Sequence, residues 1–150
     1  MQGAGRLYES FGRGLQKIME KIADKNKIII DLPFVAPSLN EFYANANPYF
    51  RSSIVKRLKN DVQWLLISKG FRQKSFPFGK SKVDIFVTVC FADKKHRDVD
   101  NYFPKPVIDA LKGFLIINDD ERYVNSCSVC IKLGRPEIKT VIEIKKAKYD

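Results

Sequence analysis

The strongest constraint on the fold is the run Val83–Phe91, which is dense in β-branched and aromatic side chains. Such a composition is typical of a β-strand. The run leads directly into a segment of cations and then of acids, so the end of this strand must lie beside polar residues. Similar β-rich runs occur elsewhere, and the sequence predicts three more strands, at Lys27–Leu32, about Tyr123–Leu133 and Ile138–Lys146.

Helical patterns alternate with these strands. The longest follows Ser52 and Ser53, which could cap it, and should stop near Gly70. A shorter helix is introduced by two prolines and runs through Lys112, where Gly113 is a natural stop. The longer helix shows an apolar face made of Ile54, Val55, Leu58, Val62, Leu65 and Leu66, with Lys56, Arg57, Lys59 and Asn60 turned outward.

A third helical pattern, over Leu7–Lys25, precedes the first strand and is amphipathic. We therefore divide the chain into an N-terminal helical extension over residues 1–26 and a main domain over residues 27–150. Pro37–Tyr43 is expected to be an irregular approach segment. The order α-β-α-β-α-β-β predicts an α+β single domain, with helices packed on a mixed or largely antiparallel sheet.

Bulk composition narrows the range of partners and compartments. The chain has 150 residues, with 27 Lys and Arg against 17 Asp and Glu, which gives a net charge of +10. A surplus of this size favours a polyanionic partner, above all nucleic acid. The chain has three cysteines, a small and odd number that argues against a disulfide scaffold. With no apolar run of the ~20 residues that a membrane span needs, we expect a cytoplasmic protein without a membrane partner.

Acidic residues nevertheless gather in one part of this basic chain. Six of the seventeen acids lie between Lys94 and Glu121. Crowded carboxylates repel one another unless a cation sits between them. The six are Asp98, Asp100, Asp109, Asp119, Asp120 and Glu121. A carboxylate cluster on a cationic surface is what a metal-dependent nuclease needs.

The spacing of four of these acids suggests a Mg²⁺ site. Asp98 and Asp100 follow a strand, and an extended backbone there would turn both side chains to one face. The chain could then fold back and bring Asp119 or Asp120 near them. Mg²⁺ prefers oxygen ligands and keeps several waters, which leaves room for a substrate phosphate. The alternative is that the aspartates are turn and capping residues, a common role for Asp.

Cations near the acids could contact the substrate. Lys105 could neutralise the scissile phosphate, or it could simply pair with Asp109 four residues later on the helix. Other candidates for phosphate contact are Lys94, Lys95 and Arg97, together with Arg72 and Lys74 from a basic, aromatic loop. That loop, with Phe71, Phe76 and Phe78, could stack on unpaired bases or could cover the core.

These residues together resemble the RusA family of Holliday junction resolvases. The resemblance covers about Ile28 to Lys146 and is carried by Asp98-Val99-Asp100-Asn101, Lys105, Asp109-Ala110-Leu111 and Asp119-Asp120. Upstream, Pro37-Ser38-Leu39-Asn40 with Tyr43 is similar to the family's N-terminal motif. This chain departs from the family in having one residue more between Asn101 and Lys105.

The resemblance implies a RusA-like nuclease domain over residues 27–150. It implies a homodimeric endonuclease that cuts four-way DNA junctions by paired, symmetric incisions, with Mg²⁺ as cofactor and Mn²⁺ as a substitute. Asp98, Asp100 and Asp120 would be catalytic metal ligands, Asp119 an accessory ligand and Lys105 a catalytic residue. Two other functions stay open: a non-catalytic nucleic-acid-binding protein, and a Mg²⁺-dependent nuclease that acts on other branched DNA or on RNA.

Overall fold

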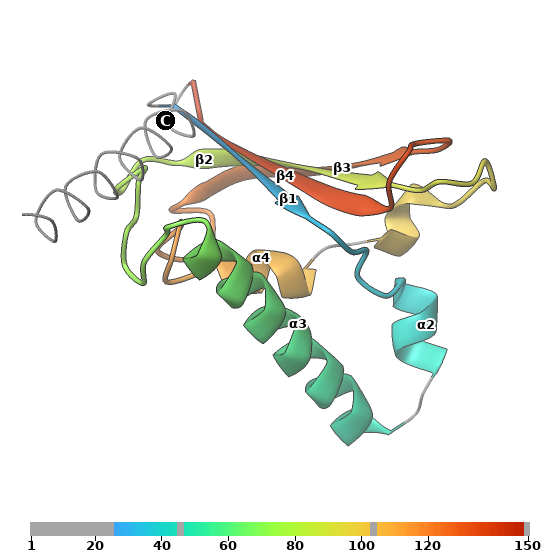
Figure 1. The fold of residues 1–150 in the computed structure, drawn as a ribbon. Helices are drawn as coiled ribbons and strands as arrows, with labels where there is room; N and C mark the ends of the chain where they lie inside the picture. Colours follow the sequence, from blue (N-terminus) through green and yellow to red (C-terminus); the bar gives the residue numbers. More distant parts are fainter. Residues whose placement is uncertain (1–25, 45–46, 103–104, 149–150) are drawn as a thin grey trace, which may run out of the picture.

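A computed structural model describes residues 26–44, 47–102 and 105–148, which form an α+β unit around a four-stranded sheet (Figure 1). The helices α3 and α4 lie against one face of the sheet (Figure 1). The strands are β1 (Lys27–Leu32), β2 (Val83–Cys90), β3 (Val124–Lys132) and β4 (Lys139–Lys146). The helices are α2 (Leu39–Ala44), α3 (Pro48–Ser68) and α4 (Lys105–Leu111), with a 3-10 helix η1 (Val99–Tyr102). The predicted α+β class is thus confirmed.

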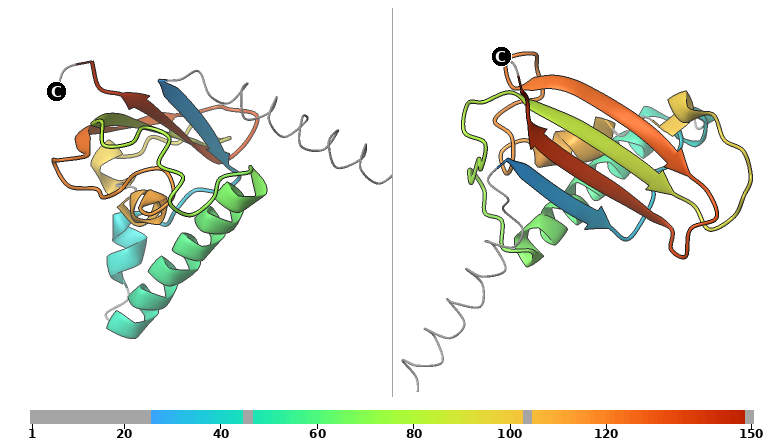
Figure 2. Two further views of the ribbon diagram at one scale, coloured as in Figure 1. Left: turned by 90° about the vertical axis from the view of Figure 1, so that its left-hand side faces the viewer. Right: turned by 90° about the horizontal axis from the view of Figure 1, so that it is seen from above.

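The sheet is mixed, with the strand order β1-β4-β2-β3. β4 runs antiparallel to both β1 and β2, whereas β2 and β3 are parallel. A parallel pair needs a crossover that returns the chain to the starting end of the sheet. Here the crossover runs from residue 91 to residue 123 and contains η1 and α4 (Figure 2). All the predicted site residues except Arg72 and Lys74 belong to it.

The core lies between the helices and one face of the sheet. Alternate residues of β2 and β4, among them Ile85 and Ile142, are fully buried, and so are Val62 and Leu66 of α3. Period-two burial is expected of a sheet with one covered face. The opposite face carries no helix from the described residues (Figure 2), and Phe86 on it is exposed.

Two predictions about the first helices are wrong. The segment expected to be irregular, Pro37–Tyr43, instead contains most of α2 (Leu39–Ala44), because Ser38 and Glu41 make a reciprocal capping box. The backbone N–H of Ser38 donates to the Glu41 carboxylate at 2.8 Å, and the N–H of Glu41 donates to the Ser38 hydroxyl at 3.2 Å. The helix α3 begins at Pro48 with Asn47 as its cap, one turn before Ser52.

The predicted helix over Leu7–Lys25 lies outside the described residues. Within the ranges that the structure describes, none of the helices is both long and apolar enough to span a membrane.

Candidate functional site

The predicted metal ligands lie in two segments that adjoin different strands of the sheet. Asp98 follows β2, Asp100 lies in η1, and both are exposed. Asp119 and Asp120 lie in the turn that leads into β3, and β3 begins beside Val83, the first residue of β2. The two ends of the eight-residue strand β2 are roughly 25 Å apart. Asp98 and Asp100 follow its last residue, whereas Asp119 and Asp120 precede the strand that begins beside its first residue. The two acidic pairs therefore depart from opposite ends of the parallel pair.

No metal site is assembled in the part of the chain that the structure describes, because no three His, Cys, Asp or Glu side chains come together there. The backbone also does not continue extended from Asp98 to Asp100, because Val99 and Asp100 belong to the 3-10 helix η1. The N–H of Asn101 donates to the carbonyl of Asp98 at 3.2 Å and opens the 3-10 helix. The ligand role of Asp98, Asp100, Asp119 and Asp120 therefore stays a prediction.

The structure does join two of the stretches that carry the resemblance. The side-chain oxygen of Asn101 accepts a hydrogen bond at 2.9 Å from the backbone N–H of Asn40, which is 61 residues earlier in the chain. The helices η1 and α2 lie in contact around this bond. The segments Pro37–Asn40 and Asp98–Asn101 consequently form one surface at the end of the sheet where β2 stops.

A second polar group lies along α4 and consists of two lysines and two aspartates. Lys105 Nζ lies 3.2 Å from Asp109 Oδ1 and 3.6 Å from Asp119 Oδ2. Lys112 Nζ lies 3.4 Å from Asp109 Oδ1 and 3.2 Å from Asp119 Oδ1. We call these four residues the α4 ion cluster. Two positive and two negative charges balance in it, so Asp119 is held beside Lys105 without a metal.

The sequence anticipated only part of the α4 ion cluster. The Lys105–Asp109 pair follows from their helical spacing. Lys112 directly follows α4 and lies three residues after Asp109, and this spacing could have revealed it. Asp119 lies beyond the turn at Gly113, whose positive φ of 80° ends α4 as predicted.

The α4 ion cluster favours the charged forms of Asp119 and Lys112. Partial burial works to raise the pKa of Asp119, but the hydrogen bond and charge of Lys112 outweigh burial and hold this pKa below its usual value. Burial likewise works to lower the pKa of Lys112, and the Asp119 and Asp109 carboxylates reverse the effect and raise it. Both groups are charged at neutral pH.

Asp120 is paired with one cation, Arg122, and with the side-chain amide of Asn118. Arg122 Nη2 lies 2.7 Å from Asp120 Oδ2, and Asn118 Nδ2 donates to the same oxygen at 2.6 Å. The hydrogen bonds from Arg122 hold the pKa of Asp120 below its usual value. Sequence reasoning did not anticipate Arg122, although it lies only two residues from Asp120.

The basic residues after β2 differ in how free they are. Lys94 and Lys95 are exposed, whereas Arg97 is held by two hydrogen bonds of 2.8 Å to the carboxylate of Asp93. The Arg97 guanidinium also lies 3.8 Å from the centre of the Phe91 ring. This geometry favours a structural role for Arg97 and leaves the two lysines for contacts with a ligand.

The Arg97–Asp93 pair predicts a measurable titration. Arg97 and then the Lys95 backbone N–H lower the pKa of Asp93 to about 2. Because this pKa is depressed on folding, the pair contributes to stability above the unfolded pKa near 3.9 and loses that contribution as pH falls towards 2. NMR titration of the Asp93 carboxyl should show a midpoint near 2 that moves up in Arg97→Gln. A midpoint near 3.9 in the unmodified chain would contradict the pairing.

The basic, aromatic loop between α3 and β2 covers the core. Phe78 is buried and Phe71 packs against the core cluster, so neither ring is presented for stacking on bases. Arg72 and Lys74 are exposed, and the N–H of Lys74 bonds to the carbonyl of Gly113 at 2.6 Å. These two cations thus lie near the end of α4, at a distance from Lys94 and Lys95 along the sheet.

Neither a scan against models of protein families nor a search of curated proteins finds a match to this chain.

Proposed function

We propose that this chain is a Mg²⁺-dependent endonuclease that resolves four-way DNA junctions by paired, symmetric hydrolysis of phosphodiesters. The observation that carries the proposal is the contact between Lys105 and Asp119, whose charged atoms lie 3.6 Å apart. Lys105 is itself only five residues after Asp100 in the sequence. The contact places a cation beside one of the predicted metal ligands. A phosphate that undergoes hydrolysis needs both a metal ion and a nearby cation to neutralise its charge. The net charge of +10 supports nucleic acid as the substrate class.

The chemistry of the acidic residues fits Mg²⁺, although their positions do not yet form one coordination sphere. Asp98, Asp100 and Asp120 would hold the ion with Asp119 as an accessory, and all four offer the oxygen atoms that Mg²⁺ prefers. Bound there, Mg²⁺ would supply an activated water and neutralise phosphate charge. Assembly requires Asp120 to leave Arg122, and such exposed ion pairs are weak because water screens them.

Within the proposed site, Lys105 would orient and neutralise the scissile phosphate. The side chain of Lys105 is 61% exposed, so a phosphate can reach it while Asp109 and Asp119 keep it in place. A homodimer would place two such sites on two like strands, because a two-fold enzyme repeats each contact. We propose a cytoplasmic setting, in which the three free cysteines stay reduced.

The test of this function is a comparison of substrates. With Mg²⁺, we expect paired symmetric nicks in a four-way junction, and little cutting of a linear duplex of the same sequence or of an RNA hairpin. EDTA should abolish the cleavage. Cleavage of the RNA hairpin in preference to the junction would support the alternative RNA nuclease. If none of the three substrates is cut in the presence of Mg²⁺, the proposal that this chain is a nuclease is contradicted.

One observation favours the non-catalytic alternative, a protein that only binds nucleic acid. Asp119 and Asp120 are both neutralised by lysine or arginine in the described structure, as structural aspartates would be. Under this alternative the junction is bound but stays intact with every divalent metal, which the same assay measures.

Two lysines of the α4 ion cluster provide a matched pair of variants. Lys105→Gln should reduce junction cleavage by about 100-fold, because it removes a donor aimed at developing phosphate charge. Lys112→Gln removes the same charge from the same two aspartates, but Lys112 is only 34% exposed, and we expect a loss below about tenfold. Single-turnover rates at saturating enzyme would separate the two. Equal losses would show that Lys105 acts only as part of the ion cluster.

A further inference from the structure

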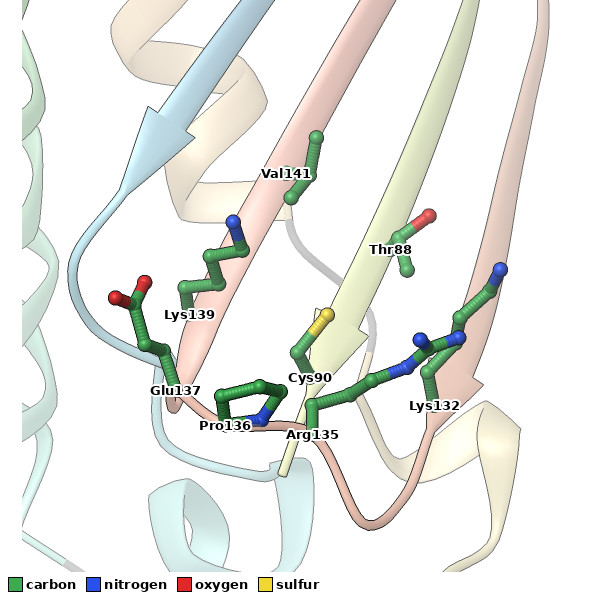
Figure 3. Close-up of a pocket in the computed structure, with 8 residues that line it drawn as sticks. All are labelled: Thr88, Cys90, Lys132, Arg135, Pro136, Glu137, Lys139 and Val141. Carbon is green, nitrogen blue, oxygen red and sulfur yellow. The ribbon is translucent and has the colours of Figure 1, made fainter. Parts of the chain in front are cut away.

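A pocket of about 490 Å³ lies on the uncovered face of the sheet, at the end where β2 stops (Figure 3). Three cations line it, and the sequence analysis singled out none of them. We call it the sheet-end pocket and define it by Thr88, Cys90, Lys132, Arg135, Glu137 and Lys139. It lies outside the α4 ion cluster and shares none of the predicted metal ligands.

The register of the sheet explains why the cations meet. Cys90 pairs with Lys132 of β3 on one side and with Lys139 of β4 on the other. Paired residues point to the same face, and neighbouring strands are about 4.8 Å apart, so the two lysine backbones lie about 10 Å apart across Cys90. Arg135 comes from the following loop and lies beside Lys132 (Figure 3).

The position of Arg135 is fixed by its backbone. Its N–H donates to the carbonyl of Phe91 at 2.9 Å, and the N–H of Gly134 donates to the carbonyl of Asp93 at 2.8 Å. These two bonds tie the loop after β3 to the loop after β2. The loop is therefore held in place when a ligand arrives, which reduces the ordering entropy lost on binding.

The sheet-end pocket carries a surplus of positive charge. Lys139 Nζ pairs with Asp31 at 3.4 Å, and Glu137 lies at the side of the pocket. Lys132 and Arg135 form no ion pair with any residue in the described ranges. Like charges that line one pocket repel one another, and an anion between them relieves the repulsion.

The surroundings favour a chain of phosphates over a single small anion. The side chain of Lys94 lies against Gly134, 3.5 Å from where a Cβ would stand. The exposed Lys94 therefore continues the surface of the sheet-end pocket around the end of the sheet, and the exposed Lys95 follows it in the chain. A row of cations along an open surface matches a polyanion whose charges repeat every few ångströms.

We propose that the sheet-end pocket binds a backbone phosphate of nucleic acid through Lys132, Arg135 and Lys139, next to the contacts of Lys94 and Lys95. The proposal rests on the proposed function only in taking nucleic acid as the ligand, and it holds for a nuclease and for a non-catalytic binder alike. Such contacts give affinity and salt dependence without sequence preference.

The first test compares two triple variants of the full chain. Lys132→Gln/Arg135→Gln/Lys139→Gln empties the pocket of cations, and Lys56→Gln/Arg57→Gln/Lys59→Gln removes three exposed charges from α3 as a control. The affinity for a 30-base-pair duplex is measured in EDTA over a range of salt. The pocket variant should flatten the slope of log K against log salt by about 2 to 3, at roughly 0.9 for each lost phosphate contact. Equal slopes for both variants would overturn the proposal.

The second test reads the site directly in the unmodified chain. Duplex DNA should protect Lys132 and Lys139 from acetylation, as measured by mass spectrometry, and should leave Lys56 and Lys59 reactive. A parallel arm uses inorganic phosphate at matched ionic strength. The proposal would be overturned if inorganic phosphate protected Lys132 and Lys139 as well as DNA does. It would also be overturned if DNA protected all four lysines to the same degree.

Both tests are made without Mg²⁺ and are therefore independent of cleavage. Protection of Lys132 and Lys139 in a chain that never cuts a junction would support the phosphate site and contradict the nuclease. Junction cleavage with unprotected pocket lysines would do the reverse.

Discussion

Asp100→Asn should reduce cleavage of a four-way junction by more than about 100-fold while leaving junction binding intact or tighter. The substitution keeps the size of the side chain but removes a charged oxygen ligand from the proposed Mg²⁺ site, and loss of one electrostatic partner of a reaction commonly costs this much. Binding is retained because a negative charge that repels phosphate is also removed. Asp100 is exposed and packs into no core, so the fold should tolerate the change.

The measurement is a single-turnover cleavage rate with Mg²⁺, paired with junction affinity in EDTA. Asp61→Asn is the matched control, because Asp61 is an exposed aspartate of α3 away from the acidic stretch. We expect this control to cut at the unmodified rate. A wild-type rate for Asp100→Asn would refute the proposed metal site, and weakened binding in EDTA would show that Asp100 acts in the fold instead.

Leu66→Ala should lower the free energy of unfolding by about 2–5 kcal/mol, the range found for large apolar side chains deleted from cores. Leu66 lies in α3 with no exposed surface, in the layer between the sheet and the helices. Removing its isobutyl group leaves a cavity where α3 packs, and the surrounding side chains can close such a cavity only in part. Urea unfolding, followed by circular dichroism, measures the change.

The neighbouring residue provides the control for Leu66. Ile67 is 48% exposed, so Ile67→Ala should change the free energy of unfolding by no more than about 0.5 kcal/mol. The two variants delete similar apolar groups from adjacent helical positions. Equal destabilisation by both would contradict the packing of α3 described above.

The local amino-acid composition predicted where the strands lie, but it did not predict which strands pair with one another. Val83–Cys90 forms β2 almost as expected, because β-branched residues fit a half-buried sheet. Nothing in the sequence near Val124 announces that β3 lies parallel to β2. That choice depends on how the crossover packs, and it also determines where Asp119 and Asp120 lie relative to Asp98.

The same limit applies to the candidate site. Lys105 and Asp109 are one helical turn apart, so their contact could be predicted from spacing. Asp119 reaches Lys105 only because the chain turns back at Gly113. The cations of the sheet-end pocket meet only through the register of three strands. The overlooked helix α2 is different, because the capping box of Ser38 and Glu41 was visible in the sequence.

The place of β4 in the sheet has a consequence for synthesis of the chain. Among the four described strands, β1 pairs only with β4, which is the last of the four to be made. During translation, β1 and the inner edge of β2 therefore stay without their partner until Lys139–Lys146 has emerged. Contacts that span almost the whole chain form late and slowly. The incomplete sheet meanwhile exposes unpaired strand edges and apolar residues, which makes this the interval in which the nascent protein is most open to aggregation and to capture by chaperones.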